Sequence, residues 1–379
     1  MPKPIAALAP PARLLCGPGP TNVEPAALAA MNKPMLGHLD PAFHAILDEV
    51  VGMLAEVYRA REGMVLPLQS TGTSGMEAGI VNLVEPGDTV IVGVSGYFGA
   101  RIAEIARRHG ANVVEVAEEW GRHVPNERLV GALERNQGAR LVAVVHGETS
   151  TGVEHPLGEL GEALRDTGTL LMADCVTTLG GVRLEFDAWG VDYAYSCTQK
   201  CLGAPPGMSP LAISQRALER IETRSRPVPF SLDLRLLRDY FVERPPAYHH
   251  TAPILHVYAL HEVLRGTLEE GVEQRWARHL QAGRRFAAGA EEAGLEVLAE
   301  ADHRLAPLTA IRVPEGIDGK DVQGRLLADH GLEVGGGLGP TAPPIWRVGL
   351  MGPNAREETA DMVLAALTGV LEGERVPVA

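Results

Sequence analysis

The sequence has few cysteines, no excess of positive charge and no long apolar run. The cysteines are Cys16, Cys175, Cys197 and Cys201. They lack the spacing of metal ligands, so we expect reduced and mostly buried thiols. A formal net charge of −14 argues against nucleic acid or an anionic membrane as a partner. Because no apolar stretch reaches membrane-spanning length and the first residues have no clean apolar core for a secretory signal, we expect a cytoplasmic protein.

The chain of 379 residues is too long for one typical core, which predicts two domains. Internal repeats and low-complexity tracts are also absent. Up to about residue 255, apolar runs alternate with helix-like segments, as in a mostly parallel α/β sheet covered on both faces. After that residue, long helical stretches precede short strands, which indicates a smaller α+β domain. We predict a flexible arm over residues 1–15, a large domain over 16–255 and a small C-terminal domain over 256–379.

The predicted strands of the large domain are apolar at nearly every position. They cover residues 64–68, 89–94, 112–116, 141–145, 170–173, 193–196 and 208–213. A helix should begin at Asp40-Pro41, because aspartate is a favoured N-cap and proline a favoured first helical residue. Other predicted helices cover 100–109, 157–167, 255–270, 272–293, 321–330 and 356–371. The small domain should have strands at 295–297, 308–313 and 345–348.

Two of these strands end near residues of opposite charge. The run at 170–173 leads into Asp174, and the run at 193–196 precedes Lys200. Pyridoxal phosphate needs an amine for its aldehyde and a carboxylate for its protonated ring nitrogen, so the pair suggests chemistry with this cofactor. A surface lysine near a helix-capping aspartate is the alternative that the pattern leaves open.

Three further loops follow predicted strands. The segment 69–75 is rich in small and hydroxyl residues and should open a helix at Met76, which is typical of a phosphate cup but also of a plain turn. In the segment 145–152, Thr149 or Ser150 could bond a cofactor oxygen or could cap a turn. In the loop Gly96-Tyr97-Phe98-Gly99, Phe98 could stack on a flat ring or pack in the core.

Two sites in the second half of the chain remain. His249 and His250 are adjacent and have no third ligand nearby, so we do not expect a metal site there. Arg347 lies in an apolar strand after the glycine-rich segment 335–339, and an arginine there needs an anion. That anion could be a substrate carboxylate or the partner in a structural ion pair.

Taken together, these residues make the chain resemble the class V pyridoxal-phosphate-dependent aminotransferases of the alanine–glyoxylate or serine–glyoxylate type. The resemblance runs from Gly17 to about Leu371. Its motifs are Gly17-Pro18-Gly19-Pro20-Thr21, Gly37-His38-Leu39-Asp40-Pro41, the loop 70–76, the segment 146–152, Asp174, Gln199-Lys200, Tyr248-His249-His250-Thr251 and Arg347. It implies the fold type I of aspartate aminotransferase, with a large domain around a mostly parallel seven-stranded sheet, a small C-terminal domain and an obligate homodimer.

The resemblance also implies roles for individual residues. Lys200 becomes the lysine that holds the cofactor and carries the substrate proton, and Asp174 the partner of the ring nitrogen. Arg347 should bind the substrate carboxylate, with Gly19 in the substrate site. The remaining cofactor contacts are Thr71, Gly72, Thr73 and Gln199 at the phosphate, Thr149, Val176 and Phe98 around the ring, and Tyr248 and Thr251 at the phosphate of the neighbouring subunit's cofactor.

The implied reaction is a ping-pong transamination from alanine or serine to glyoxylate or pyruvate. Phe98 stands where some relatives have tryptophan, and Thr73 where histidine can occur. A cysteine desulfurase tends to have histidine before the lysine and a cysteine on a later mobile loop, but here Gln199 precedes Lys200 and the segment 335–339 has no cysteine. A phosphoserine aminotransferase would need an additional basic cluster, and a nicotinamide-dependent dehydrogenase a glycine-rich fingerprint after the first strand; neither is evident.

Overall fold

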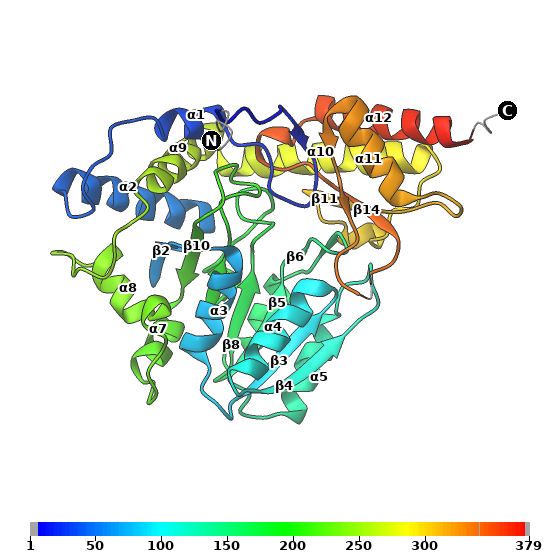
Figure 1. Cartoon of the computed structure of the whole chain (residues 1–379). Coiled ribbons are helices and arrows are strands. Elements are labelled where there is room, and N and C mark those ends of the chain that lie inside the picture. The colour runs from blue at the N-terminus through cyan, green and yellow to red at the C-terminus, as the bar shows by residue number, and fades with distance from the viewer. Residues whose placement is uncertain (1–6, 341, 376–379) are drawn as a thin grey trace, which may run out of the picture.

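A seven-stranded sheet forms the centre of the larger part of the molecule (Figure 1), in a computed structural model that describes residues 7–340 and 342–375. Its strands are β2 (Met64–Leu68), β3 (Thr89–Val94), β4 (Asn112–Ala117), β5 (Leu141–Val145), β8 (Leu170–Asp174), β9 (Tyr193–Tyr195) and β10 (Ser209–Ile213). Their order is β2-β10-β9-β8-β5-β3-β4. Strand β10 is antiparallel to both neighbours and the other pairs are parallel, which confirms the predicted sheet.

Helices flank this sheet (Figure 1), because its strands are apolar on both faces. They are α1 (Pro25–Ala30), α2 (Pro41–Tyr58), α3 (Gly72–Leu83), α4 (Tyr97–Arg108), α5 (Asn126–Arg135), α6 (Gly158–Leu164), α7 (Gln215–Glu222), α8 (Leu234–Phe241) and α9 (Ile254–Glu270). A hairpin of β6 (Gly147–Glu148) and β7 (Val153–Glu154) follows β5. The start of α2 is as predicted, since Asp40 is its N-cap and accepts a hydrogen bond from the amide of Ala42 at 2.8 Å.

The chain after α9 builds a second hydrophobic core, around Phe286, Leu326, Trp346 and Val363. It contains α10 (Val272–Glu292), α11 (Gly319–His330), α12 (Glu357–Arg375) and an antiparallel sheet of β11 (Leu308–Arg312), β14 (Ile345–Gly349) and β13 (Gly335–Gly336). Strand β1 (Leu14–Leu15) pairs in parallel with β12 (Leu332–Glu333), so the first described strand lies against the C-terminal part. Of the predicted arm, residues 1–6 lie outside the described residues.

Three predicted elements differ in the structure. No strand forms at 295–297, where only an isolated bridge joins Val297 to Ile311. Helix α3 begins at Gly72 rather than at Met76, because Thr71 caps it by accepting a hydrogen bond from the amide of Ser74 at 3.2 Å. Helix α4 begins three residues earlier than predicted, so the segment 96–99 is the start of a helix and not a loop.

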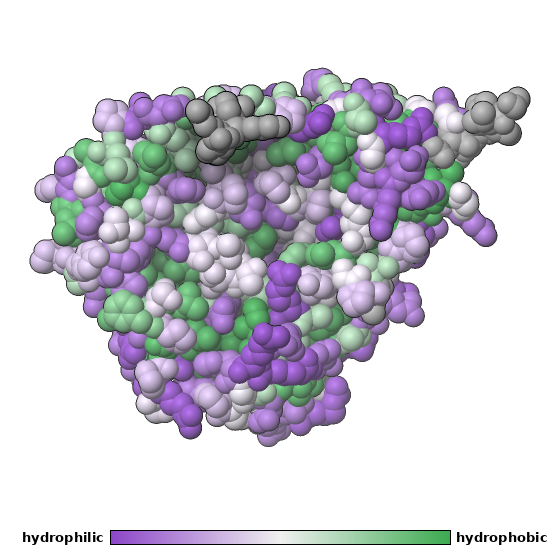
Figure 2. Space-filling view, in the orientation of Figure 1, coloured by the Kyte–Doolittle hydropathy of each residue, from purple (hydrophilic) through white to green (hydrophobic). Residues whose placement is uncertain are grey.

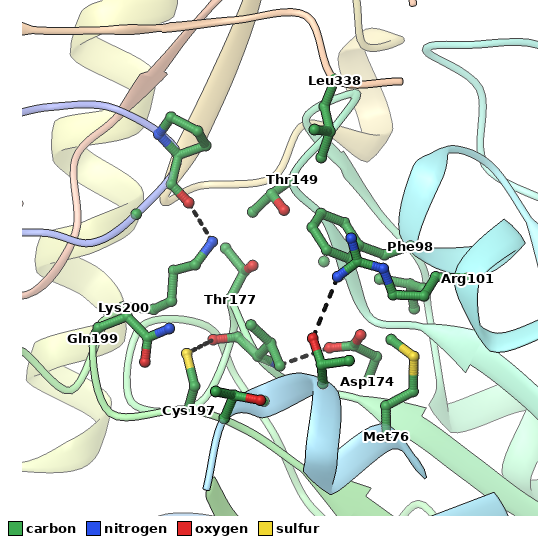
Figure 3. A pocket seen from close by; sticks show the side chains of 18 of the residues that line it. Met76, Phe98, Arg101, Thr149, Asp174, Thr177, Cys197, Gln199, Lys200 and Leu338 are labelled. Atoms are coloured by element: carbon green, nitrogen blue, oxygen red, sulfur yellow. Dashed lines mark hydrogen bonds between the residues drawn. The ribbon is translucent and has the colours of Figure 1, made fainter. Parts of the chain in front are cut away.

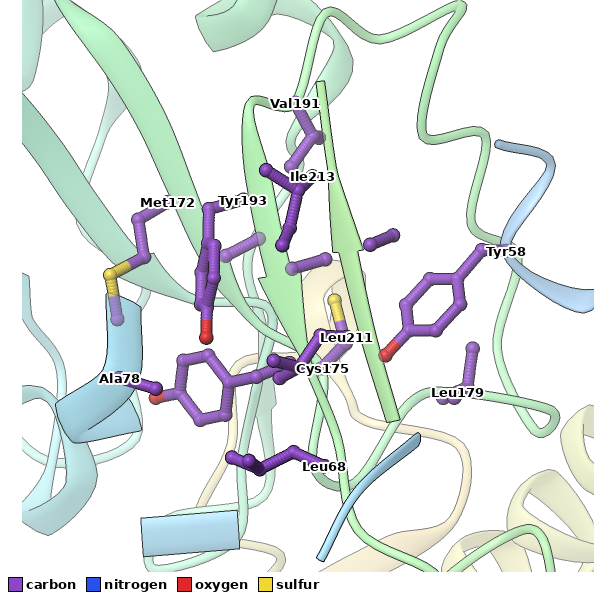
Figure 4. Close-up of a cluster of buried hydrophobic side chains, with 14 of the residues drawn as sticks. Tyr58, Leu68, Ala78, Met172, Cys175, Leu179, Val191, Tyr193, Leu211 and Ile213 are labelled. Carbon is purple, nitrogen blue, oxygen red and sulfur yellow. The ribbon is translucent and has the colours of Figure 1, made fainter. Parts of the chain in front are cut away.

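Buried tyrosines tie the sheet to the helices beside it (Figure 4). The hydroxyl of Tyr193, on β9, donates a hydrogen bond to the carbonyl oxygen of Gly75 in the first turns of α3, at 2.8 Å. The hydroxyl of Tyr58, at the end of α2, donates to the carbonyl oxygen of Pro210 on β10, also at 2.8 Å. Because buried hydroxyls need partners, these bonds fix the helices in register with the strands.

The surface in Figure 2 has strongly hydrophilic side chains over α4 and α11, between patches of mixed hydropathy. Helix α4 carries Arg101, Arg107 and Arg108, which explains part of this polar surface. No helix in the described part of the chain is both long and apolar enough to pass through a membrane.

Candidate active site

A cavity of about 340 Å³ lies beside the carboxyl end of β8, between the large sheet and the C-terminal part (Figure 3). Its walls come from segments that are far apart in the sequence. The predicted site residues that line it are Gly19, Thr71, Gly72, Thr73, Phe98, Thr149, Asp174, Val176, Gln199, Lys200 and Arg347. Met76, Arg101, Thr177, Cys197 and Leu338 also line it, and sequence reasoning did not find them.

Asp174 is the last residue of β8 and is almost completely buried. One carboxylate oxygen accepts a hydrogen bond from the hydroxyl of Tyr195 at 2.7 Å, and the other from the amide of Val176 at 2.9 Å. Burial raises the pKa of this carboxyl to about 6, against the opposing effect of the two hydrogen bonds. A buried carboxylate with a raised pKa is stabilised by a cationic partner in the cavity, so the position suits a group that brings positive charge.

Lys200 lies in the turn after β9 and is also buried. Its amine donates a hydrogen bond to the carbonyl oxygen of Pro18. The next residue, Gly19, has φ +109°, and a Cβ there would lie 2.5 Å from the side chain of Lys200, so only glycine fits. Burial lowers the pKa of Lys200, which favours the neutral amine that nucleophilic and proton-transfer chemistry requires.

The start of α3 lines one end of the cavity and has the features that suit an anion. Thr71 is the N-cap, and a Cβ at Gly72 would lie 2.9 Å from the side chain of Val176, so the backbone approaches the cavity closely. The amides of a helix N-terminus favour negative charge. On the facing segment, the side-chain oxygen of Gln199 is buried and has no hydrogen-bond partner among the described residues.

Phe98 is placed by a carboxylate that sequence reasoning missed. Glu148, at the end of β6, is fully buried and accepts hydrogen bonds from the amides of Phe98 at 3.0 Å and Gly99 at 3.2 Å. The amide and hydroxyl of Ser150 also donate to it, at 3.1 and 2.6 Å. Glu148 therefore caps α4 from 50 residues away, and the hydroxyl of Ser150 is engaged there, which leaves Thr149 as the hydroxyl of this loop at the cavity.

Arg101, one turn further along α4, lies over the ring of Phe98, with its guanidinium carbon 5.0 Å from the ring centroid (Figure 3). It also donates a hydrogen bond to the hydroxyl of Thr73 at 3.3 Å. This arginine therefore connects the aromatic wall of the cavity to the start of α3. No ion pair of Arg101 occurs among the described residues.

Arg347 enters the cavity from β14, in the C-terminal part. It donates hydrogen bonds to the carbonyl oxygen of Gly336 at 2.6 Å and to that of Thr149 at 3.2 Å. Burial lowers the pKa of Arg347 to about 10, and in the described part of the chain no carboxylate pairs with it. The alternative of a structural ion pair is therefore not observed, and the guanidinium remains available for an anion in the cavity.

Tyr248 and Thr251 do not reach this cavity within their own chain. The Tyr248 side chain is 64% exposed and packs near the ring of His38, with 5.5 Å between the centroids. The neighbouring His249 and His250 contact each other through their rings. The four residues thus form a surface segment outside the cavity that Lys200 lines.

The residues present fit pyridoxal phosphate. The cavity combines a buried amine at Lys200, a buried carboxylate at Asp174 and a helix N-terminus for a phosphate. Phe98 and Val176 supply apolar walls for a flat ring. Each functional group of the cofactor therefore has a chemically matching partner.

A family model described as Aminotransferase class-V matches residues 26–352. The chain belongs to the class V aminotransferases. The family confirms the resemblance, and with it an aminotransferase that uses pyridoxal phosphate and has the type I fold. Membership of this family excludes the alternative that the chain is a nicotinamide-dependent dehydrogenase.

Relatives match over almost the whole chain. The (S)-ureidoglycine–glyoxylate transaminase of Bacillus subtilis is 37% identical, with 95% of this chain and 91% of that protein covered. The alanine–glyoxylate aminotransferase of Drosophila melanogaster is 36% identical, covering 97% and 94%. The crystal structure of an alanine–glyoxylate aminotransferase from Nostoc is 47% identical, with a TM-score of 0.94 and 97% of both chains covered. Structures of a cysteine desulfurase and a phosphoserine aminotransferase, at 15% and 18% identity, share the fold alone.

Proposed function

We propose that this aminotransferase moves the amino group of alanine or serine to glyoxylate, with pyruvate as an alternative acceptor. The observation that carries the proposal is Arg347, a buried guanidinium without a carboxylate partner in the cavity that Lys200 and Asp174 also line. Every donor and acceptor of this reaction carries a carboxylate, which the planar fork of an arginine binds with two parallel hydrogen bonds. One arginine can therefore serve both halves of the reaction.

The size of the cavity supports small substrates. About 340 Å³ must hold the cofactor together with the substrate, which leaves room for an acid with few atoms. The named relatives have different donors, but glyoxylate appears in the names of both. Glyoxylate is therefore the better supported acceptor. Ureidoglycine is a further candidate donor besides alanine and serine, because the name of the relative with 37% identity includes it.

Each charged residue of the cavity has a separate role in the proposed reaction. Pyridoxal phosphate, when bound, draws electrons from the substrate's α carbon and stores the amino group between the two half-reactions. Asp174 holds a proton on the ring nitrogen through its negative charge. Lys200, as a neutral amine, would take the proton from the α carbon of the donor and give it to the former aldehyde carbon of the cofactor, and in the second half-reaction it would carry a proton from there to the α carbon of the new amino acid. Arg347 fixes the substrate carboxylate, so that the α carbon stays within reach of Lys200.

Around the cofactor, the first turn of α3 with Thr71, Gly72 and Thr73 would hold the phosphate, and Gln199 would donate to it. Thr149 would bond the ring oxygen, and Phe98 and Val176 would pack against the two ring faces. Gly19 leaves the space that Lys200 occupies, as its Cβ position indicates.

The donor question has a direct test. The purified enzyme is mixed with alanine, serine or ureidoglycine alone, and the cofactor absorbance is followed to the amino form. Glyoxylate or pyruvate is then added to recover the starting spectrum. We expect conversion with alanine or serine and recovery with glyoxylate; a spectrum unmoved by all three donors would refute the proposed substrate class.

The proposal extends to a homodimer with shared sites. Tyr248 belongs to a motif of the family resemblance and yet is 64% exposed outside its own cavity, as expected of a residue that serves a second copy. The buried free cysteines suit a reducing compartment, which supports a cytoplasmic location. The two hydrophobic cores support a division into a large and a small domain, but the first core includes α9 and reaches Val272, and the second includes Cys16. We therefore propose a boundary after α9, near residue 271, in place of the predicted one at 255.

Mixed dimers test the sharing. One subunit carries Lys200→Ala, and the other carries Tyr248→Phe and Thr251→Ala. If these two residues serve the neighbouring subunit, each mixed dimer contains one intact site and regains roughly half of the wild-type rate, because the two mutated groups fall in the same site. If they serve their own chain, one site lacks Lys200 and the other lacks Tyr248 and Thr251, so the mixed dimers reach at most about half of the rate of the Tyr248→Phe and Thr251→Ala parent.

A further inference from the structure

Three potential metal ligands meet outside the cavity, on two segments joined to different cores. His123 lies between β4 and α5, and Glu300 and His303 lie in the segment 300–303 between α10 and β11. One ligand atom of each residue lies within 4.8 Å of the other two. The imidazole rings of His123 and His303 are stacked, with their centroids 3.5 Å apart and an interplanar angle of 16°.

The backbone holds these two segments in place without an ion. The amide of Glu300 donates to the carbonyl oxygen of Gly121 at 2.9 Å, and the amide of His123 donates to the carboxylate of Glu300 at 2.9 Å. The ring of His303 contacts the carbonyl oxygen of Glu154 at 3.3 Å. The backbone therefore needs little reordering. The stacked rings direct their nitrogen lone pairs along nearly parallel planes, so the ring of His303 must turn about its side-chain bonds for both imidazoles to reach one ion.

The charge of the cluster also suits a cation. Glu300 is the carboxylate of the cluster, and it accepts a hydrogen bond from the amide of His123 and contacts the ring nitrogen of the same residue. The nearby Arg304 forms an ion pair with Glu291, so its charge is balanced. The side chains of His123 and Glu300 are 22% and 30% exposed, which leaves a path for an ion.

We propose that His123, Glu300 and His303 bind a zinc ion, with water in the fourth position. Two imidazole nitrogens and one carboxylate form a ligand set that zinc takes with an open position, whereas Ca²⁺ and Mg²⁺ prefer oxygen ligands throughout. The ion lies between the ring nitrogen of His123 and the carboxylate oxygen of Glu300, which are 2.5 Å apart without it. It links the segment after β4 to the segment before β11.

The test uses the untagged holoenzyme, stripped with a chelator and titrated with ZnCl₂ by calorimetry. We expect binding of about one zinc ion per chain, and His303→Ala should weaken it by about tenfold or more. The matched control is His330→Ala, which removes an exposed histidine at the end of α11 and should leave binding unchanged.

A second measurement works even if His303→Ala is unstable. In His303→Cys, the thiolate should bind CoCl₂ and add a near-ultraviolet sulfur-to-cobalt absorption that the wild type lacks. The absence of that absorption, or of stoichiometric zinc binding by the wild type, overturns the proposal. It is equally overturned if His249→Ala with His250→Ala abolishes zinc binding and His303→Ala does not.

Discussion

The two walls of the cavity are built in different ways. The wall from the large sheet holds Asp174 and Lys200, both buried near strand ends, with hydrogen bonds to Tyr195 on the neighbouring strand and to Pro18 in the N-terminal segment. The wall from the C-terminal part holds Arg347, whose strand belongs to a separate hydrophobic core. If these residues have the proposed roles, cofactor chemistry and substrate recognition depend on different cores. Variants on the first wall should therefore change rate and cofactor attachment, and variants on the second should change substrate affinity.

The largest effect is expected at Lys200. Lys200→Ala should abolish multiple turnover while the fold survives, because no other buried amine in the described part of the cavity can replace it. Borohydride reduction of the wild type followed by peptide mapping should find the cofactor on Lys200. Cofactor fixed to any other lysine would show that the first wall has been misassigned.

The next largest effect is expected for Asp174→Asn. The amide keeps the shape of the side chain but has no negative charge to hold a proton on the ring nitrogen. We expect cofactor binding to persist and the rate to fall by about a thousandfold, the upper range for removing one electrostatic group from an active site. Single-turnover absorbance measurements give the rate of the variant and of the wild type. A rate within about threefold of the wild type would place the control of ring charge elsewhere.

Arg347→Ala tests the second wall. The spectrum of the bound cofactor should stay nearly unchanged, while the apparent KM for donor and acceptor should rise together. Loss of one partner of a desolvated charge pair costs about 3 kcal/mol, or roughly a hundredfold in kcat/KM. Arg347→Lys should recover only part of the lost kcat/KM, since an ammonium cannot make the bidentate contact. Loss of cofactor with an unchanged KM would instead make Arg347 a structural residue of the first wall.

Sequence reasoning worked where the signal was local. Asp174 ends an apolar strand and Lys200 lies in the turn after the next strand of the sheet, and the structure places both at one cavity, while their roles stay predictions. Asp40-Pro41 marks a helix start within two residues. It failed where the determinant lies far along the chain. The early start of α4 depends on Glu148, 50 residues beyond Phe98, and the hydrogen bond from Tyr195 to Asp174 depends on the pairing of β8 with β9. The prediction of a strand at 295–297 was wrong, because only one bridge joins this segment to β11.

Arg101 shows most clearly what the sequence could not reveal, and it carries the smallest predicted effect. On α4 it looks like Arg107 and Arg108, part of a solvated helix face, but it lies over Phe98 and donates to Thr73. Both residues line the cavity, so we expect Arg101 to hold them in place for the cofactor. Its contribution should resemble that of one partly exposed cation–π contact, about 1 kcal/mol.

Arg101→Ala should therefore raise the dissociation constant of pyridoxal phosphate by about fivefold. It should leave the KM for glyoxylate unchanged, since substrate affinity belongs to the second wall. The matched control is Arg108→Ala on the same helix, which removes only an exposed ion pair with Glu104. Fluorescence titration of the cofactor-free variants measures the difference. Equal cofactor affinity in the two variants would mean that Phe98 and Thr73 hold their positions without Arg101, through Glu148 and the capped start of α3 alone.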